Sequence, residues 1–239
     1  MIGDKDALER SKVEEEWDQY WTKASDKSKS AYDLIAHFYR RYLIKRTLNH
    51  FIKKNFQKGE KLLHAGCGSG EVDEDVTKLF PVTALDISNK ALERYKHNNP
   101  DTEVINGDIF SLPFPAESFQ GIYNLGVMEH FTKEQIHEIL NEFRRVIKKN
   151  GKIVLFWPPS FGATVIALDS IHFFLHKILR SKTILHPLEI SRIQSRKHAR
   201  KILQQAGFTL EKFYFGPKDG FTHAILVASP NAHLDPHKT

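Results

Sequence analysis

Three glycines stand within five residues, at Gly66, Gly68 and Gly70, directly after a short apolar run. Glycine lets the backbone approach a ligand closely, and the N–H groups at the start of a following helix favour electron-rich ligand groups. Asp86 ends a second apolar run, twenty residues after Gly66. A carboxylate at that place can accept hydrogen bonds from both hydroxyls of a ribose. The glycines and the carboxylate together predict a nucleoside-binding site.

The spacing of the glycines argues against a dinucleotide as the ligand. The dinucleotide pattern G-x-G-x-x-G requires a glycine where this chain has Glu71, and Gly70 comes one residue too early. A carboxylate beside a pyrophosphate would repel it. A cationic nucleoside without phosphates fits this turn better.

Short apolar runs alternate with helical patterns from residue 61 onward, which indicates the elements that must position the glycines and Asp86. Strands are predicted at 62–65, 82–85, 103–106, 120–124 and 153–156, and helices at 72–79, 88–97 and 133–148, with Gly151 expected to end the third helix. This alternation predicts parallel βαβ units in a doubly wound, Rossmann-like α/β fold. A last helix at 197–205 precedes strands at 208–215 and 221–228. Their Gly/Pro/Asp connection predicts that a seven-stranded sheet ends in an antiparallel hairpin.

Composition indicates a globular chain and limits its chemistry. The 239 residues are 41% hydrophobic and 27% charged, which excludes disorder of the whole chain. The single cysteine, Cys67, excludes an internal disulfide framework and a cysteine-built zinc site. With no apolar run at the N-terminus, we expect no secretory signal and a cytoplasmic protein. The most apolar stretch, 161–179, carries Asp169 and Lys177, and we do not expect it to span a membrane.

The net charge of +6 is concentrated in one stretch. Residues 177–201 hold eight basic residues and one acid, Glu189. This basic run indicates either an anionic partner or a solvated helix face. His172 and His176 lie four residues apart and could face one ion, but no acidic residue completes such a set, and we expect no metal.

Five segments, in order, resemble the motifs of class I S-adenosylmethionine-dependent methyltransferases that act on small molecules, among them quinone-biosynthesis methyltransferases. The resemblance covers roughly residues 61–157. Its motifs are LLHAGCGSG at 62–70, TALDIS at 83–88, NGDI at 106–109 with LPF at 112–114, NLGVMEH at 124–130, and GKIVL at 151–155.

The resemblance implies that S-adenosyl-L-methionine is the cofactor and S-adenosyl-L-homocysteine the product. It assigns the methionine half to the glycine turn, the ribose hydroxyls to Asp86 and the adenine amine to Asp108. Ile87 and Ile109 would enclose the adenine. The residues implied in cofactor binding are Ala65, Gly66, Cys67, Gly68, Gly70, Asp86, Ile87, Asp108, Ile109, Asn124 and Leu125, the last two bordering the sulfonium through their backbone carbonyls.

Three further residues deserve separate interpretation. His64 stands where the family more often has Asp or Glu, and we interpret it as a histidine satisfied at a strand end. Glu129 and His130 follow the fourth strand at the end of the sheet where ligands bind, so they are the catalytic candidates. Their alternative roles are helix capping for Glu129 and solvent exposure for His130.

The resemblance also implies a domain organisation. We expect an N-terminal helical lid over residues 1–57, with Trp17, Tyr20, Trp21 and Tyr32 near the cofactor, and the methyltransferase domain over 58–229. Residues 158–196 are a helical insertion over the acceptor, and 230–239 a loose tail. The expected acceptor is a small or lipid-like molecule, with an anionic group among the options and contact with an anionic membrane as a further one. An RNA methyltransferase and a nucleoside-binding module without catalysis are the alternatives, and the sequence does not give the oligomeric state.

Overall fold

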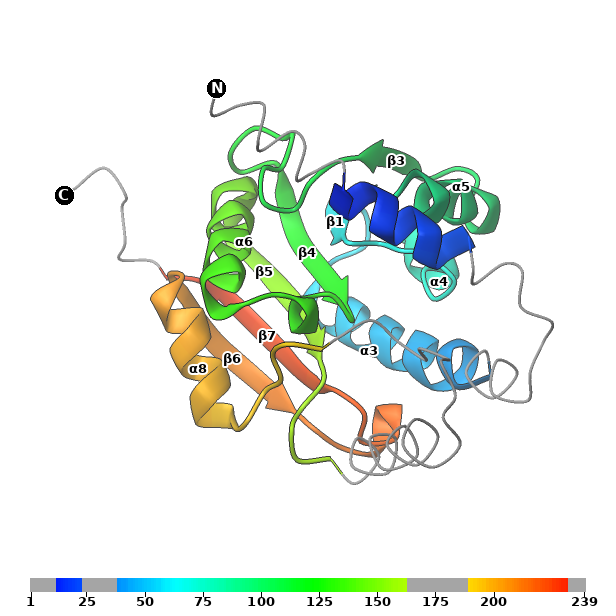
Figure 1. Ribbon diagram of the computed structural model, residues 1–239. Coiled ribbons are helices and arrows are strands. Elements are labelled where there is room, and N and C mark those ends of the chain that lie inside the picture. The colour runs from blue at the N-terminus through cyan, green and yellow to red at the C-terminus, as the bar shows by residue number, and fades with distance from the viewer. Residues whose placement is uncertain (1–11, 23–37, 163–188, 232–239) are drawn as a thin grey trace.

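The computed structural model describes residues 12–22, 38–162 and 189–231. A seven-stranded sheet forms its centre, in the order β3-β2-β1-β4-β5-β7-β6 (Figure 1). The strands are β1 Leu62–Ala65, β2 Val82–Asp86, β3 Glu103–Asn106, β4 Phe119–Leu125, β5 Ile147–Trp157, β6 Phe208–Tyr214 and β7 Ala224–Pro230. The first five strands are parallel and β7 is antiparallel to β5 and β6. The predicted doubly wound sheet with a closing hairpin is confirmed.

The order of the strands reverses at β1. The chain moves outward from β1 through β2 to β3, and then returns to place β4 on the other side of β1. In an open α/β sheet, ligands bind outside the carboxyl ends of the strands at such a switch point. The glycine turn after β1 and the residues after β4 therefore flank the expected site.

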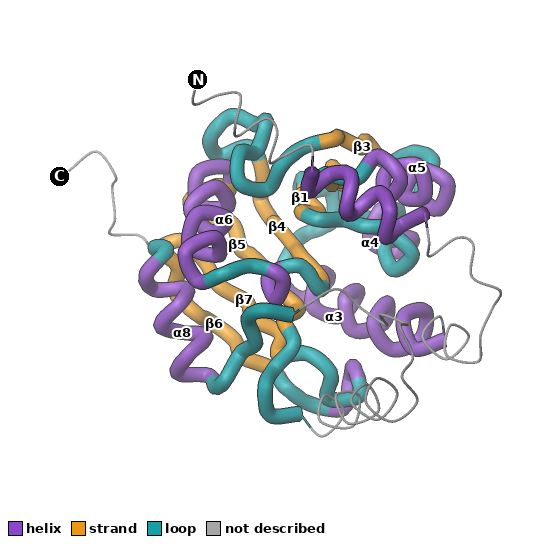
Figure 2. Tube along the Cα trace, in the orientation of Figure 1, coloured by secondary structure: helices purple, strands orange, loops and turns teal. Residues whose placement is uncertain are grey.

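Helices cover both faces of the sheet (Figure 2). One face carries α3 Lys45–Asn55, α4 Glu74–Thr77 and α5 Asn89–Asn98, and the other carries α6 Lys133–Val146 and α8 Arg196–Gln205. Period-two alternation divides the strand side chains between the two cores, as β5 shows: Leu155 packs toward α6 and α8, and Phe156 toward α3. The π-helical turn η1 Arg40–Ile44 leads directly into α3.

Side chains that the sequence offers as caps begin the helices. The Ser88 hydroxyl accepts the N–H of Ala91 at the start of α5, as predicted. Thr132 and Gln135 form a reciprocal capping box at α6. These local signals explain why the predicted positions of α5 and α6 agree closely with the structure.

Gly151 does not end a helix, so that prediction is wrong. Helix α6 stops at Val146, and Ile147 is already extended and pairs with Phe119 at the start of β5. Gly151 lies inside β5, where a Cβ atom would stand 2.6 Å from the carbonyl oxygen of Gln120. A glycine is needed here because the backbone of β5 comes close to that of β4 beside a bulge. In the sequence alone, a glycine after a helical pattern looks the same as one that ends a helix.

Two other predicted elements differ in length. The helix expected over 72–79 is the single turn α4. The last strand begins at Ala224 and not at Phe221, because the N–H of His223 donates to Asp219 of the 3₁₀ turn η3 Pro217–Asp219 and not to a neighbouring strand. Most of the expected insertion lies outside the described residues, as do Tyr32, His172 and His176. Among the helices that the structure does describe, none combines the length and the apolar character needed to cross a membrane.

Candidate functional site

The glycine turn leaves β1 through left-handed backbone that only glycine adopts readily. Gly66, Gly68 and Gly70 have φ angles of +70°, +52° and +61°. The N–H groups of Gly66 and Cys67 both donate to the carbonyl of Leu85, so β2 fixes where the turn begins. Cys67 is buried, and burial raises the pKa of its thiol well above the usual value. Its role is therefore packing beneath the turn.

Asp86 joins the glycine turn to the next helix. Its Oδ2 accepts the N–H of Gly68 at 2.8 Å, and its Oδ1 accepts the N–H of Ser88 at 3.0 Å. The side chain is buried, which raises its pKa, while the two backbone donors act in the opposite direction. Each carboxylate oxygen keeps capacity for another donor, as the hydroxyls of a ribose require.

The end of β3 brings the predicted adenine residues beside Asp86. Asn106 pairs with Asp86 in the sheet, and its side-chain amide donates to the carbonyl of Ile87 at 2.8 Å. Asp108 and Ile109 follow directly. Oδ1 of Asp108 accepts the N–H of Phe110 at 3.0 Å, which leaves Oδ2 for an amine donor. Turn formation and ligand binding by Asp108 are therefore compatible.

Asn124 stands at the switch point with an unused acceptor. Its Nδ2 donates to the carbonyl of Ala65 at 3.1 Å and so ties β4 to the glycine turn. Its Oδ1 is buried and has no hydrogen-bond partner among the described residues. A buried acceptor without a donor costs free energy unless a ligand or water satisfies it. Leu125 and Gly126 follow it at the strand end.

A helix over residues 12–22 lies across the carboxyl ends of β1 and β2 (Figure 1). Trp21 lies so close to Gly68 that a Cβ there would stand 2.9 Å from the indole. Asp18 accepts the hydroxyl of Ser88 at 2.5 Å and the N–H of Lys90 at 3.1 Å. Trp21 therefore lies beside the glycine turn, and the role of this helix as a lid stays a prediction.

His64 belongs to a buried network that the sequence only half reveals. Its Nδ1 lies 2.6 Å from Oδ2 of Asp73, and its ring stacks on Tyr123 at 4.3 Å between centroids. The hydroxyls of Tyr95 and Tyr123 donate to the same Oδ2 at 2.5 and 2.9 Å. His64 is therefore a satisfied core histidine, as interpreted. Its partner Asp73 was missed, because nothing in the local pattern distinguishes Asp73 from the acids around it.

The two catalytic candidates have different surroundings. Glu129, in the 3₁₀ turn η2 Met128–His130, is 4% exposed, and its Oε2 has no hydrogen-bond partner in the described part of the chain. Burial, assisted by the nearby charge of Glu189, raises the pKa of Glu129 to about 8. Its backbone carbonyl accepts hydrogen bonds from the N–H groups of Ile190 and Ser191, so residues 189–194 are fixed against η2. His130 is half-buried and meets Trp17 edge-on, with ring centroids 5.4 Å apart.

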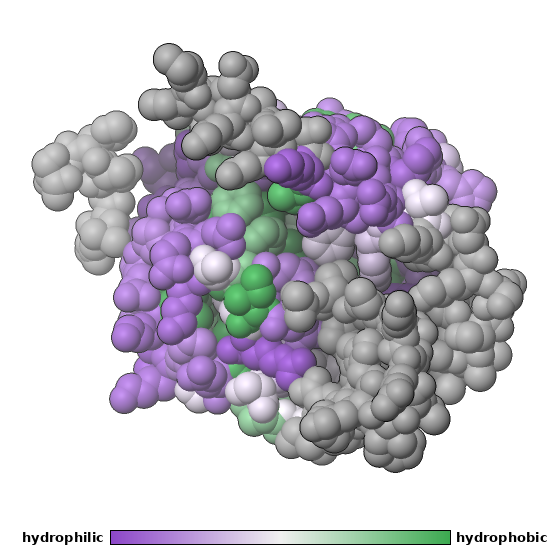
Figure 3. Space-filling model, in the orientation of Figure 1, coloured by the Kyte–Doolittle hydropathy of each residue, from purple (hydrophilic) through white to green (hydrophobic). Residues whose placement is uncertain are grey.

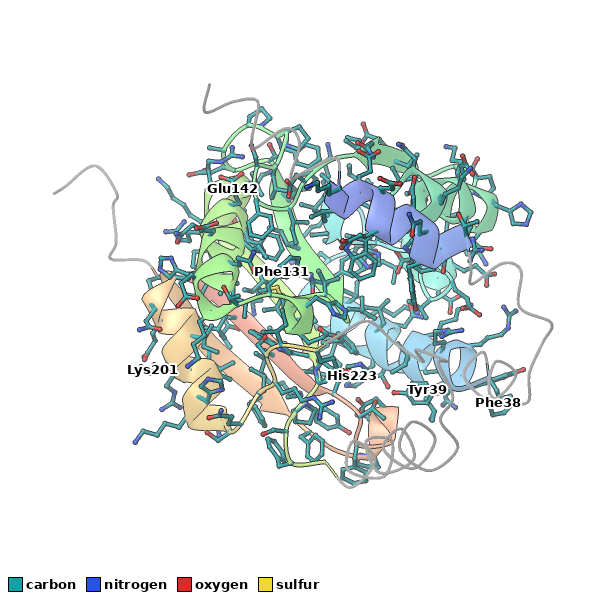
Figure 4. The ribbon with its side chains drawn as sticks, viewed as in Figure 1. Phe38, Tyr39, Phe131, Glu142, Lys201 and His223 are labelled. Atoms are coloured by element: carbon teal, nitrogen blue, oxygen red, sulfur yellow. The ribbon has the colours of Figure 1, made fainter. Side chains whose placement is uncertain are left out.

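Apolar surface borders these candidates. Figure 3 shows hydrophobic surface in the middle of the viewed face, between the hydrophilic helix 12–22 and the hydrophilic α6 and α8. Phe131 lies in this region (Figure 4) and packs edge-on against Phe110 at 5.3 Å. Ile190 is 62% exposed. A wall of this kind suits an acceptor with a substantial apolar part.

A second carboxylate–histidine pair stands at the start of β7, and the sequence interpretation missed it. Asp219 is fully buried, and its Oδ2 accepts the backbone N–H of His223 at 2.7 Å and lies 3.2 Å from Nδ1 of that ring. The hydroxyl of Tyr39 donates to the carbonyl of Asp219 at 3.2 Å. The spacing of four residues between Asp219 and His223 was the available signal. The pair fixes the β6–β7 connection to the start of η1.

Residues 63–155 match a family described as a methyltransferase domain. The demethylmenaquinone methyltransferase of Thermotoga maritima is 34% identical over 99 residues, which cover 40% of this chain and 42% of that protein. The mitochondrial ubiquinone biosynthesis O-methyltransferase of Schizosaccharomyces pombe is 32% identical over 113 residues, 44% of this chain and 40% of that protein. The chain thus spans less than half the length of these relatives.

Solved structures agree on the fold. The magnesium protoporphyrin IX methyltransferase of Synechocystis PCC 6803, crystallised with S-adenosylhomocysteine, superposes with a TM-score of 0.67 at 15% identity, covering 95% of this chain and all of that one. The chain therefore has the fold of class I S-adenosylmethionine-dependent methyltransferases. A Burkholderia thailandensis 1,6-didemethyltoxoflavin-N1-methyltransferase gives a TM-score of 0.64 at 13% identity, covering 96% and 90% of the two chains.

The described residues around the glycine turn fit S-adenosylmethionine as a ligand. The glycine turn allows close backbone approach, and Asp86 supplies paired acceptors. Oδ1 of Asn124, which has no partner among the described residues, can accept a hydrogen bond from the ligand. Asp108 adds an acceptor beside them. No residue among these is a cation that would oppose a sulfonium.

Proposed function

We propose that this protein transfers a methyl group from S-adenosylmethionine to a small molecule with a large apolar part. The observation that carries the proposal is the junction of Gly68 and Asp86, whose hydrogen bond holds the glycine turn and the paired acceptors in one rigid unit. The proposed cofactor contacts are those implied by the resemblance, from Ala65 through Leu125. We also propose that residues 1–57 form a lid over the cofactor and that residues 158–196 cover the acceptor. The contact between Trp21 and Gly68 supports the lid.

Alignment is the main catalytic task proposed for the chain. When bound, S-adenosylmethionine supplies a methyl group on an already activated sulfonium. The residues of the site then need to orient the acceptor and exclude water, which can lower a barrier by about 7–11 kcal/mol. We propose that Trp17, which contacts His130, and Trp21, which contacts Gly68, exclude water from the site. Asn124 and Leu125, at the end of β4, would line its opposite side.

Glu129 is the better placed of the two candidate proton acceptors. A general base works best with a pKa near the working pH and contributes about 10²–10⁴-fold when the acceptor must lose a proton. The buried carboxyl of Glu129, with a pKa of about 8, meets that requirement, and its Oε2, which has no hydrogen-bond partner among the described residues, can hold the proton. We propose that His130 lines the acceptor side below Trp17.

Two observations support an acceptor with a large apolar part. Phe131 and Ile190 form an apolar wall beside the site, and two relatives are named as methyltransferases of quinone biosynthesis. We propose a lipid-like acceptor and a cytoplasmic location, where a single buried thiol needs no partner. An RNA acceptor is less well supported, because Phe110 and Phe131 pack on each other and leave no gap for a base.

Calorimetry with S-adenosylhomocysteine tests the cofactor site. We expect binding by the wild type, and a loss of at least about tenfold for Asp86→Asn, whose amide cannot accept from both Gly68 and Ser88. Asp101→Asn is the matched control, since Asp101 is exposed on the loop before β3. Equal affinity of the wild type and Asp86→Asn, or no heat from the wild type, would overturn the proposal.

The acceptor is identified by a separate experiment, in which the protein transfers a labelled methyl group from S-adenosylmethionine into a lipid extract.

A further inference from the structure

An exposed stripe of aromatic and basic residues follows one side of the helix formed by η1 and α3. Phe38, Tyr42 and Leu43 are 60%, 51% and 38% exposed, and the rings of Phe38 and Tyr42 lie 4.3 Å apart. Arg46, His50 and Lys54 continue the stripe at intervals of four residues, and all three are exposed. The apolar members occupy the start of the helix and the basic members follow. We call these six residues the η1–α3 stripe.

The connection between β6 and β7 extends the stripe sideways. Lys218 lines a shallow hollow of about 280 Å³ together with Tyr42, Leu43, Arg46, Thr47 and His50. The hydroxyl of Thr47 donates to the carbonyl of Lys218 at 2.7 Å, which fixes the two segments together. Phe221, three residues further on, is 43% exposed although its φ is +61°, an unfavourable backbone conformation for a bulky residue.

The charges around this hollow are positive and unpaired. Arg46, Lys54 and Lys218 form no ion pair with any residue in the described ranges 12–22, 38–162 and 189–231, whereas neighbouring Lys45 is paired with Glu74 and Asp75. Partial burial lowers the pKa of His50, and Lys218, Lys212 and Lys54 lower it further. Within the part of the chain that the structure describes, no acidic side chain forms an ion pair with these three basic residues.

We propose that the η1–α3 stripe, with Lys218 and Phe221, docks this protein on the surface of an anionic lipid bilayer. Apolar residues of interfacial proteins enter about 5–10 Å into the boundary between headgroups and acyl chains. Arg46 lies four residues after Tyr42, about one turn further along the helix that η1 and α3 form. When Phe38 and Tyr42 enter the boundary, Arg46 and Lys218 thus reach the level of the lipid phosphates.

The location of the surface adds to the argument. Figure 4 shows Phe38 at the outer end of this helix, pointing away from the sheet. The connection that carries Lys218 and Phe221 leads into β7, whose first residue, Ala224, pairs with Trp157 at the carboxyl end of β5. Docking would bring the ligand-binding edge of the sheet near the bilayer.

Sedimentation of the full chain with phosphatidylcholine vesicles, with and without 30% phosphatidylglycerol, tests this surface. We expect binding only to the anionic vesicles, weakening as salt increases. Arg46→Glu with Lys218→Glu should lower the partition coefficient at least about 30-fold, given the usual contribution of each basic residue near an anionic surface. Phe38→Ser with Tyr42→Ser should lower it as well, and this loss should persist at high salt.

Arg200→Glu with Lys201→Glu is the matched control, because it changes the net charge equally on α8, where Lys201 stands far from Phe38 (Figure 4). We expect a change of less than about threefold. No binding by the wild type, an equal loss in both charge-reversed variants, or tighter binding of a single-stranded RNA oligomer would overturn the proposal. S-adenosylhomocysteine calorimetry on the same variants should be unchanged, which shows that they fold and separates this test from that of the proposed activity.

Discussion

Nδ1 of His64, at the end of β1, lies 2.6 Å from Oδ2 of Asp73, which begins α4. The carboxylate stands between this imidazole and the hydroxyls of Tyr95 and Tyr123, all of them buried. The contact links the strand before the glycine turn to the helix after it. The buried contact between His64 and Asp73 therefore fixes the segments on both sides of the glycine turn.

Asp73→Ala should destabilise the protein by about 3–5 kcal/mol, because it leaves a buried imidazole and two tyrosine hydroxyls without their shared acceptor. Tyr95→Phe removes one donor and should cost about 1 kcal/mol. Urea unfolding measures both. A loss below about 1 kcal/mol for Asp73→Ala would show that water or a rearranged partner replaces the carboxylate.

Gly70→Ala should be much more costly than Gly59→Ala, although both glycines have positive φ. A Cβ at Gly70 would stand 2.3 Å from the ring of Tyr95, whereas nothing lies within 4 Å of a Cβ at Gly59. We expect about 1 kcal/mol for Gly59→Ala from the backbone alone, and about 3 kcal/mol for Gly70→Ala. Thermal unfolding compares them, and similar losses would mean that the contact with Tyr95 relaxes freely.

Trp21→Ala should weaken binding of S-adenosylhomocysteine about tenfold, because the indole that covers Gly68 is lost. Val13→Ala serves as the control, since Val13 lies on the same helix and is 42% exposed. Calorimetry gives both affinities. Unchanged affinity in Trp21→Ala would argue that residues 12–22 pack on the domain without covering the cofactor.

Glu129→Gln should change how stability depends on pH. Burial raises the pKa of Glu129 from 4.5 to about 8, so the folded state retains a proton that the unfolded state releases between those values. The wild type is therefore destabilised as pH rises, by up to about 1.4 kcal/mol per pH unit from this group. The amide cannot ionise, and the difference between wild type and variant should move in favour of the variant from pH 5 to pH 8. Urea unfolding across this range measures it, and parallel curves would contradict the raised pKa.

The sequence by itself determined the order of the elements and the position of the glycine turn. Glycines, apolar runs and capping side chains determine structure over a few residues. The turn at Gly66, the strand end at Asp86 and the helix start at Ser88 could therefore be predicted from the sequence. Gly151 was misjudged because its purpose, the close approach of Gln120, is a contact between distant segments.

Only the tertiary structure decided which distant side chains meet. It paired His64 with Asp73, enclosed Glu129 beneath residues 189–194, and brought Lys218 to the hollow beside Arg46. Burial and electrostatic environment depend on the packing of segments far apart in the chain, and local patterns do not encode that packing. The conformation of the glycine turn depends on local sequence and was predictable, whereas the raised pKa of Glu129 and the hollow between Arg46 and Lys218 arise from packing.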